Sequence, residues 1–501
     1  MSSHILAFPS GRSLAGPSHG VNAGLVFRSP LHSATVTPDT AMSDSPRGTD
    51  ATLERLSDYA GRLRYDDISA EALHQVKRTL IDTLGCGAGA FDEEPAAIAR
   101  RTAGRVQGNP GARILGTSQC TSMDLAAFAN TVLVRYLDCN DTYAAARGTG
   151  HPSDMIPAVL AVADGRRASG RAAITAITLA YEVFCRVADE VPLKGWDQGM
   201  FVAIGAACGA GKILGLDRAA MGHAISIAIT TGIPLGVTRV GELSMWKGCA
   251  TAAAVRTGVF AAELAAEGMT GPGHPFGGRD GLWQHLGIDA PAWSRFGGAG
   301  EPFRITRTSF KAYPAVVHTQ GPIGLVLELR SQLAATDIAS VRVATYGEAV
   351  RRTATEAEKW DPQTRETADH SIPYLVAVAL QDGAVSPATF TPRRIQDPTL
   401  RPVIKKLTVV EEPEFTRRYP AESCTRIEVT TTDGRRLTAR TSYPKGHRGN
   451  PLTDAEVEAK FRGLAGDALG PNARDRLLAA VWRLEDAATV DELFEGLSVS
   501  R

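Results

Sequence analysis

The sequence has few cysteines, and none of them lies close to another. The seven stand at positions 86, 120, 139, 185, 208, 249 and 424, and they include no C-x-x-C pair. An odd, scattered set is not typical of a disulfide framework and indicates a reducing compartment. It also disfavours a zinc or iron–sulfur centre, because such centres usually draw on ligand pairs that are close in sequence. We therefore expect a cytoplasmic protein without a metal.

The chain also lacks an excess of charge and a long apolar run. Its 54 lysines and arginines equal its 54 aspartates and glutamates. No global field therefore draws the protein to nucleic acid or to an anionic membrane. No apolar stretch approaches the roughly 20 residues that a transmembrane helix needs. We expect neither nucleic acid nor membrane as a partner, and any positive pocket for an acidic substrate has to be local.

Sequence motifs of several large enzyme classes are missing as well. From residue 50 onward we find no G-x-G-x-x-G that opens a strand–helix unit, no G-x-x-x-x-G-K-[ST], no H-E-x-x-H and no G-x-S-x-G. Such motifs supply backbone N–H groups for phosphates, zinc ligands or an exposed nucleophile. Their absence disfavours nucleotide binding, zinc peptidase activity and serine hydrolase activity.

The first 49 residues differ from the rest. They are rich in Ser, Gly and Pro, carry Arg12, Arg28 and Arg47, and contain no acid before Asp39. A transit peptide has this composition, in which case the protein is mitochondrial. We favour a disordered extension over 1–49, with Met42 as an alternative start, because Gly and Pro interrupt any amphipathic helix.

Helical periodicity dominates from about residue 50 to residue 290. Apolar residues recur at three- and four-residue spacing over 53–63 and 72–84, which is the pattern of amphipathic helices. The runs 172–187, 201–214 and 219–229 mix Ala and Gly with Ile, Leu and Val. Small residues let helices approach closely, so we predict a tightly packed helical domain over 50–290.

Strand-like patterns follow the glycine-rich stretches 271–278 and 297–300. They occupy 340–346, 406–410, 426–431 and 436–440, and Asp433-Gly434 joins the last two as a hairpin turn. We predict a smaller α+β domain over 295–445. The expected fold class is therefore mainly α, with a large all-helical domain and an α+β lid.

Helical patterns return over 450–501, in the segments 454–464, 473–484 and 491–497. Three short helices cannot bury a core of their own, so we expect them to pack on the first helical domain. The chain then crosses between the domains twice. A double crossing restricts their relative motion to hinge closure, which suits a lid over an interdomain site.

A dense group of polar residues ends one helical run, in Tyr136-Leu-Asp-Cys-Asn-Asp-Thr142. Asp138, Asp141 and Thr142 are spaced i, i+3, i+4, so they share a face if the helix continues through them. These side chains are candidates for an active site at the end of the helix.

His151-Pro-Ser-Asp154 follows a loop of small residues and leads into the apolar run 155–163. Ser153 or Asp154 is a plausible N-cap, with Pro157 in the first turn. His151 then lies beside a helix N-terminus, which favours a bound carboxylate and a neutral imidazole. A neutral histidine can act as a general base or acid near pH 7. A helix start with purely structural caps accounts for the same spacing.

Two lysines add positive charge to this picture. Lys247 precedes a run of small residues in Ser244-Met-Trp-Lys-Gly-Cys249, and a buried lysine needs a partner or attracts an anion. Lys311 stands at the start of the second domain and could bring charge to the cleft. The alternative is that Lys247 extends to the surface and that Lys311 is solvated beside a turn.

Two histidines have a structural interpretation when their local sequence is considered alone. His318 follows an Ala-Val-Val run and is more typical of a hydrogen-bonded core histidine than of a catalyst. Asp369-His370 precedes the apolar run that begins at Ile372, and we interpret the pair as the cap of that helix.

Taken together, these segments resemble the MmgE/PrpD family, which includes 2-methylcitrate dehydratases, cis-aconitate decarboxylases and an iminodisuccinate epimerase. The resemblance covers about residues 52–500. It rests on the segments Leu137-Asp-Cys-Asn-Asp-Thr142, Gly150-His-Pro-Ser-Asp154, Trp246-Lys-Gly248, Lys311-Ala-Tyr-Pro-Ala-Val-Val-His318-Thr-Gln320, Ala368-Asp-His-Ser-Ile-Pro-Tyr374 and Tyr443-Pro-Lys-Gly-His447.

The resemblance implies a helical domain with an α+β lid, commonly in a homodimer, and chemistry on a small polycarboxylate without a metal or other cofactor. We predict Asp138, His151 and Lys247 as catalytic residues. The predicted substrate-binding residues are Asp141, Thr142, Ser153, Lys311, His318 and Tyr346, the last on a lid strand where relatives carry an aromatic residue or a histidine near the pocket.

The default reaction is elimination of water from 2-methylcitrate or a similar hydroxy-polycarboxylate. Lys247 and Lys311 would hold carboxylates and neutralise developing enolate charge, while His151 and Asp138 would share the two proton transfers. Decarboxylation of cis-aconitate and epimerisation of a dicarboxylate pass through a similar carbanion-like species and remain alternatives.

One position departs from the family. Asp197 occupies the segment Gly195-Trp-Asp-Gln198, where family members often carry a histidine. This departure supports a rival of another class, a non-catalytic helical binding protein that keeps the fold.

Overall fold

The computed structural model describes residues 49–145, 147–293, 295–298, 300–333, 337–466 and 468–499. Residues 1–48 of the predicted N-terminal extension lie outside the described residues. The described residues belong to one compact unit.

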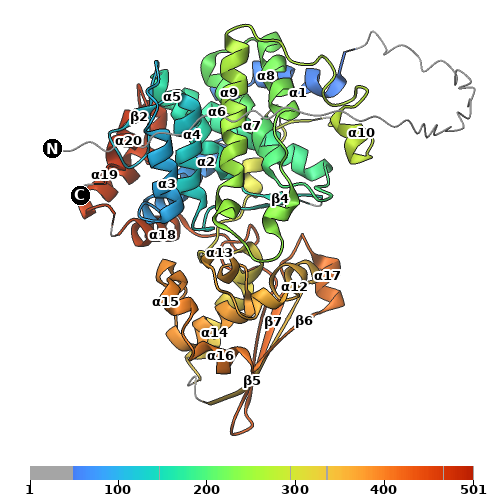
Figure 1. Cartoon of the computed structure of the whole chain (residues 1–501), viewed down its shortest axis with the longest axis vertical. Coiled ribbons are helices and arrows are strands. Elements are labelled where there is room, and N and C mark those ends of the chain that lie inside the picture. Colours follow the sequence, from blue (N-terminus) through green and yellow to red (C-terminus); the bar gives the residue numbers. More distant parts are fainter. Residues whose placement is uncertain are drawn as a thin grey trace, which may run out of the picture. The chain divides into compact units, whose positions relative to one another are not determined.

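The first part of this unit is built of helices whose lengths follow the apolar periodicity of the sequence (Figure 1). They are α1 (Ala51–Arg62), α2 (Ala70–Gly89), α3 (Glu94–Ala103), α4 (Met123–Arg135), α5 (Ile156–Gly165), α6 (Gly170–Glu190), α7 (Gly199–Leu214), α8 (Arg218–Thr230), α9 (Ala250–Ala266) and α10 (Leu282–Leu286). Two short hairpins interrupt them, β1 (Ala112–Arg113) with β2 (Cys120–Thr121) and β3 (Tyr143–Ala144) with β4 (Thr149–Gly150).

Small residues set how closely these helices pack. A Cβ atom added to Gly258 of α9 would lie 2.7 Å from the carbonyl oxygen of Ala203 and 2.8 Å from the nitrogen of Ala207, both in α7. Only a glycine allows the two backbones this approach.

The second part holds a four-stranded mixed sheet in the order β6–β5–β7–β8. The strands are β5 (Ile338–Thr345), β6 (Leu407–Glu411), β7 (Thr425–Thr431) and β8 (Arg436–Thr441); β5 pairs in parallel with β6, and the other pairs are antiparallel. Alternate residues of β7 are buried, as expected for a strand with one face on a core. Helices α11 (Gln320–Arg330) and α14 (Ile372–Asp382) contribute to that core.

Short helices complete the second part. They are α12 (Gly347–Thr353), α13 (Arg365–Ala368), α15 (Pro392–Ile395), α16 (Leu400–Ile404) and α17 (Pro413–Arg418). The predicted fold class, mainly α with a large helical part and a smaller α+β part, is confirmed.

Hydrophobic packing shows where the chain passes between the two parts. Phe303, Ile305 and Phe310 belong to the core of the helical part, whereas the core of the second part begins at Ala315. The change of core therefore lies between Phe310 and Ala315.

The C-terminal helices are α18 (Asp454–Ala465), α19 (Pro471–Trp482) and α20 (Asp491–Gly496). Val457 and Phe461 of α18 and Leu477 of α19 belong to the same core as the first helices. Of these helices, red in Figure 1, α18 and α19 accordingly contact α2. The chain thus leaves the helical core once and returns to it.

Among the described residues, no helix is long and apolar enough to cross a membrane. All seven cysteines lie among them and are free thiols.

Candidate active site

A cavity of about 1240 Å³ is lined by residues of both parts of the chain. The helical part contributes Arg135, His151 and Asp197, and the second part contributes His318, Tyr346, Tyr419 and His370 among others. Concave sites lined by two packed parts of a chain are the usual place for a small ligand.

Asp138 lies immediately behind this cavity, in a turn that the sequence did not predict. Helix α4 ends at Arg135, and Asp138 has a φ of +52°. The helix therefore does not continue through Asp138, Asp141 and Thr142, and the predicted shared helical face is wrong. A left-handed residue other than glycine is strained, and here it turns a buried carboxylate toward a group of cations.

Three cations surround the Asp138 carboxylate. Arg135 donates to Oδ1 from 2.7 Å, and the ammonium of Lys311 lies 2.5 Å from the same oxygen. The ammonium of Lys247 lies 3.0 Å from Oδ2. Burial raises the pKa of Asp138, but Arg135, Lys247 and Lys311 outweigh it and hold this pKa well below its usual range. Asp138 is therefore ionised near pH 7.

His151 approaches the same carboxylate from the helical part. Its Nε2 lies 3.9 Å from Asp138 Oδ1, and its Nδ1 lies 2.6 Å from the carbonyl oxygen of Asp141. A carbonyl only accepts hydrogen bonds, so Nδ1 carries the proton and Nε2 carries the lone pair. Burial, followed by the charges of Arg135 and Lys311, lowers the pKa of His151 well below its usual value. The imidazole is thus neutral and can accept a proton at Nε2.

Asp369 and His370 approach from the second part and correct our interpretation of them as a helix cap. The cap of α14 is Ser371, whose hydroxyl accepts from the Tyr374 N–H at 2.9 Å. Asp369 instead binds the ammonium of Lys247 through both oxygens, at 2.9 and 2.7 Å. His370 Nδ1 lies 2.5 Å from Asp369 Oδ1 and 3.8 Å from Asp138 Oδ2.

The remaining residues near Asp138 hold the backbone in place. Asp141 accepts from the Ser153 N–H at 3.1 Å and from the Tyr181 hydroxyl at 2.9 Å, and burial raises its pKa to about 7. Thr142 pairs with Ser309 through backbone hydrogen bonds of 2.8 Å in both directions. Neither Asp141, Thr142 nor Ser153 is among the residues that line the cavity.

The predicted caps beyond His151 are also different. Ser153 and Asp154 lie in a 3₁₀ turn, Pro152–Met155, and α5 follows with Met155 at its N-cap and no side-chain cap. Ser153 and Asp154 both accept from the Asn140 amide, at 2.8 Å each. Burial raises the pKa of Asp154 to about 6.

His318 and Tyr346 line the cavity together. His318 Nδ1 lies 2.8 Å from the Tyr346 hydroxyl, and the Tyr346 ring stacks on Tyr419 with centroids 4.3 Å apart. Burial lowers the pKa of His318 to about 3, so this histidine presents a neutral, polar edge rather than a charge.

Asp197, the position that departs from the family pattern, is tied to Lys247. Its carboxylate accepts from Arg239 Nε at 2.8 Å, and Arg239 Nη1 donates to the carbonyl oxygen of Lys247 at 2.6 Å. The residue at 197 thus helps to position the 3₁₀ turn Met245–Gly248 that carries Lys247.

Among the described residues, one group has the spacing needed to hold a metal ion. It consists of Asp138, Asp369 and His370, whose ligating atoms lie within 4.8 Å of one another. The Lys247 ammonium lies within 3.0 Å of both carboxylates. A divalent cation would be repelled by the positive charge of Lys247 and would have to displace it from both carboxylates. These residues therefore fit an ammonium group better than a metal.

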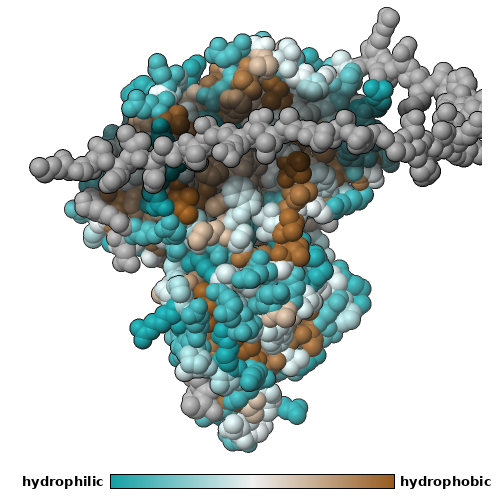
Figure 2. All heavy atoms as spheres, viewed as in Figure 1, coloured by the Kyte–Doolittle hydropathy of each residue, from teal (hydrophilic) through white to brown (hydrophobic). Residues whose placement is uncertain are grey.

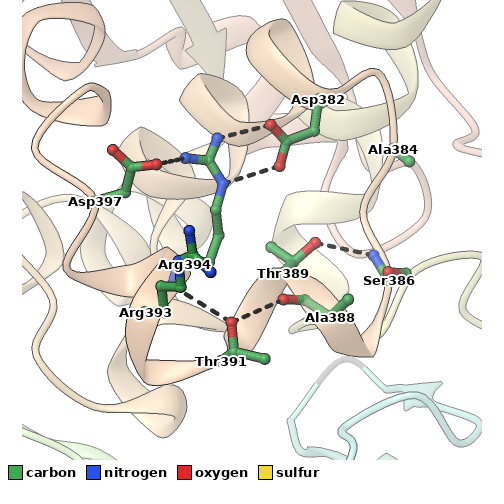
Figure 3. Close-up of a pocket in the computed structure, with 9 residues that line it drawn as sticks. All are labelled: Asp382, Ala384, Ser386, Ala388, Thr389, Thr391, Arg393, Arg394 and Asp397. Carbon is green, nitrogen blue, oxygen red and sulfur yellow. Dashed lines mark hydrogen bonds and ion pairs between the residues drawn. The ribbon is translucent and has the colours of Figure 1, made fainter.

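A second hollow, of about 420 Å³, lies in the second part (Figure 3). Arg394 points at Asp382 on one side and at Asp397 on the other, with 2.7 Å ion pairs to each. None of the predicted site residues lines it, and its arginine is satisfied within the fold.

Comparison with known proteins identifies the family. Residues 54–293 match the MmgE/PrpD N-terminal domain, and residues 313–486 match the MmgE/PrpD C-terminal domain. A 2-methylcitrate dehydratase of Cupriavidus necator is 30% identical over 489 residues, which is 88% of this chain and 95% of the relative. The mitochondrial 2-methylcitrate dehydratase of Yarrowia lipolytica is 27% identical, covering 84% of this chain and 86% of the relative. A cis-aconitate decarboxylase of Mus musculus is 24% identical, covering 87% and 92%.

The chain therefore belongs to the MmgE/PrpD family, as the resemblance of its motifs predicted.

The sequence reasoning missed three residues of the cluster, Arg135, Asp369 and His370. Arg135 sits three residues before Asp138, within reach of it, and that spacing was a usable signal. Asp369 and His370 belong to a motif that supported the family resemblance, but a helix-cap pattern accounted for both.

Proposed function

We propose that this protein is a lyase that eliminates water from a small hydroxy-polycarboxylate, with 2-methylcitrate as the first candidate. The observation that carries the proposal is the cavity with a cation-rich floor and a neutral histidine whose Nε2 lone pair is available. The relatives named 2-methylcitrate dehydratase, which align with most of the chain, support the choice of substrate.

The charges that line the cavity favour an anionic substrate. Arg135, Lys247 and Lys311 are paired with the carboxylates of Asp138, Asp154 and Asp369, whereas the cavity lining holds six lysines and arginines and three aspartates and glutamates. Arg135 lines the cavity, whereas Lys247 and Lys311 lie behind its wall and are 1% exposed. In this arrangement Arg135 contacts a substrate carboxylate, and the lysines act through their charge, which falls off slowly in a buried site.

His151 is the proposed base. In the elimination, Nε2 takes the proton from the carbon next to a substrate carboxylate, the C–H electron pair forms the double bond, and the C–O bond to the hydroxyl breaks. Asp138 is ionised and bound to three cations, so it does not donate a proton near pH 7. We assign Asp138 to holding Lys247 and Lys311 in place, which narrows the earlier hypothesis that it shares the proton transfers.

Two other reactions of the same site are alternatives. Decarboxylation of cis-aconitate is favoured by the relatives of that name, and epimerisation of a dicarboxylate needs the same proton abstraction. A non-catalytic binding protein would keep the fold but would not need a histidine with a fixed tautomer at the cavity.

A substrate panel tests the proposal. Purified protein is mixed separately with 2-methylcitrate, citrate and cis-aconitate, and the conjugated alkene is followed by ultraviolet absorbance and NMR. We expect alkene to form from 2-methylcitrate. Loss of CO₂ from cis-aconitate alone would support the decarboxylase alternative. No turnover of any of the three by folded protein would contradict the enzyme proposal and support the binding protein.

We also propose a homodimer. Six apolar side chains between residues 233 and 246 are exposed, among them Ile233 at 74% and Val237 at 71%. Figure 2 shows brown, apolar side chains in patches on the helical part of one face, whereas the second part is mainly teal. A large exposed apolar surface marks an interaction site. Light scattering after gel filtration should give twice the mass of the chain, and a monomer at every concentration would contradict the proposal.

For the compartment, we propose the cytoplasm. Fluorescence of a fusion that carries residues 1–49 in a eukaryotic cell would reveal mitochondrial import instead.

A further inference from the structure

Elimination of water needs two proton-transfer groups, and His151 is one of them. The leaving hydroxide has to receive a proton while His151 takes one from carbon. The donor has to line the cavity, and it has to lie close enough to His151 for one small substrate to contact both residues. Asp138 is not available, because its carboxylate is ionised and already bound to three cations.

His370 meets these conditions. It lines the same cavity as His151, and it belongs to the second part of the chain, whereas His151 belongs to the first. The two imidazoles lie near different oxygens of one carboxylate, with His151 Nε2 3.9 Å from Asp138 Oδ1 and His370 Nδ1 3.8 Å from Asp138 Oδ2. A substrate bound beside Arg135 can therefore contact both rings.

The neighbours of His370 fix which of its nitrogens is free. Asp369 is ionised, because Lys247 and His370 outweigh the effect of burial and lower its pKa. An ionised carboxylate only accepts hydrogen bonds, so at 2.5 Å it takes the proton of His370 Nδ1. Among the residues that the structure describes, none forms a hydrogen bond with His370 Nε2, which leaves this atom for the substrate.

Asp369 is in turn held by the Lys247 ammonium through both of its oxygens. Its backbone carbonyl accepts from the Val316 N–H at 3.0 Å. The helix cap that would otherwise explain the pair is provided by Ser371. Asp369 and His370 thus have no role in starting α14, and a carboxylate that orients a histidine toward a cavity is a common arrangement in acid–base catalysis.

We propose that His370, oriented by Asp369, is the second proton-transfer residue of the cavity and donates the proton that leaves with the substrate hydroxyl as water. The inference rests on the proposed dehydratase function. In the step, Nε2–H of the imidazolium gives its proton to the departing oxygen as the C–O bond breaks, and His151 Nε2 takes the proton from carbon. The protein ends with His151 protonated and His370 neutral, and one proton exchange with water restores both.

Binding of the substrate supplies the proton to His370. In the free protein, burial and Lys247 lower the pKa of His370 to about 4. The charged and titratable groups that face it are Lys247, Asp369, Asp138 and His318. A bound polycarboxylate adds negative charge beside this group, and nearby negative charge favours the imidazolium. Substrate binding therefore raises the pKa of His370, which favours the imidazolium in the complex, where the proton is used.

The test compares His370→Asn with His285→Asn, a matched change at an exposed histidine of α10 outside the cavity. Turnover is measured on whichever substrate the wild-type protein converts. We expect His370→Asn to lower kcat by about 10²-fold with KM changed by less than about threefold, as expected for a group that acts in the transition state. We expect His285→Asn to match the wild type. A His370→Asn variant that keeps its kcat overturns the inference.

A chemical rescue separates proton transfer from a structural role. The cavity has room for a small molecule, so free imidazole should restore part of the kcat of His370→Ala. It should restore none of the kcat of Asp138→Asn, which lacks a charge rather than a ring. If His370→Ala is inactive and imidazole does not raise its kcat, the role is structural and the inference fails.

A binding measurement keeps the inference testable if the dehydratase proposal itself fails. Tricarballylate has three carboxylates and no hydroxyl, so it cannot lose water. In protein labelled with ¹⁵N at histidine, we expect tricarballylate to raise the apparent pKa of one imidazole, and we expect this signal to be missing in His370→Asn. No such titration would overturn the inference, whereas wild-type inactivity on the whole panel would contradict only the reaction.

Discussion

Replacing His151 with asparagine is expected to lower kcat by about 10²–10⁴-fold, the range over which positioned acid–base groups act. The side chain of asparagine can still donate to the carbonyl oxygen of Asp141, where His151 Nδ1 lies at 2.6 Å. The change therefore removes Nε2 while it can keep the local hydrogen bond. The measurement is kcat and KM on the substrate that the panel identifies.

The fold of this variant should be intact. His151 packs in a loop and not in the main core, so we expect its thermal unfolding midpoint to stay within a few degrees of that of the wild type. A variant that is unfolded says nothing about catalysis, so the midpoint is measured first. Wild-type kcat in a folded His151→Asn variant would remove His151 from the mechanism.

Replacing Asp138 with asparagine is expected to lower the free energy of unfolding. The substitution leaves Arg135, Lys247 and Lys311 buried with one counter-charge fewer. Breaking a buried ion pair by removing one partner typically costs about 3–5 kcal/mol of unfolding free energy. Asparagine tolerates the left-handed conformation that Asp138 adopts at a φ of +52°, so backbone strain does not explain the loss. Urea unfolding at pH 7 measures it.

The pH dependence of this loss has a defined sign. The pKa of Asp138 is held well below its usual range in the folded state. Its stabilisation is therefore fully present above the unfolded pKa of about 3.9 and is lost as pH falls through the lower folded value. The gap in unfolding free energy between wild type and Asp138→Asn should be constant from pH 7 to about pH 5 and should shrink below about pH 4.

Asp454→Asn is the matched control. Asp454 lies within 3.3 Å of two basic side chains, those of His74 and Arg78, but it is 47% exposed. Exposed ion pairs contribute about 0–1 kcal/mol, so this variant should lose little. A loss in Asp138→Asn no larger than that in Asp454→Asn would show that the cluster around Asp138 does not support the fold.

Much of the fold follows from local patterns in the sequence. The run 426–431 with Asp433-Gly434 and 436–440 predicted a hairpin, and β7 and β8 occupy those residues within one position. The predicted helix at 454–464 is α18, with Thr453 as its cap. Such features depend on period and on turn chemistry within a few residues, and both can be read from one chain.

The candidate site was predicted less completely. The motifs indicated that four residues lie close together, and the structure brings them together: Asp138, His151, Lys247 and Lys311. Asp141, Thr142 and Ser153 lie behind the cavity, because α4 ends at Arg135 and the chain turns sharply at Asp138. Sequence spacing assumes a regular helix there, and a single left-handed residue changes which side chains face the cavity.

The sequence by itself determined the family and the order of the helices and strands, and it indicated Asp138, His151, Lys247 and Lys311 as candidate site residues. Tertiary structure alone decided that Asp369 and His370 join them from the second core, since nothing in their local pattern distinguishes a cap from a cluster. The physical reason is that Ser371 satisfies the start of α14, while the buried Lys247 ammonium needs a second carboxylate. Only packing of the two cores brings the Asp369 carboxylate to 2.7 Å from the Lys247 ammonium.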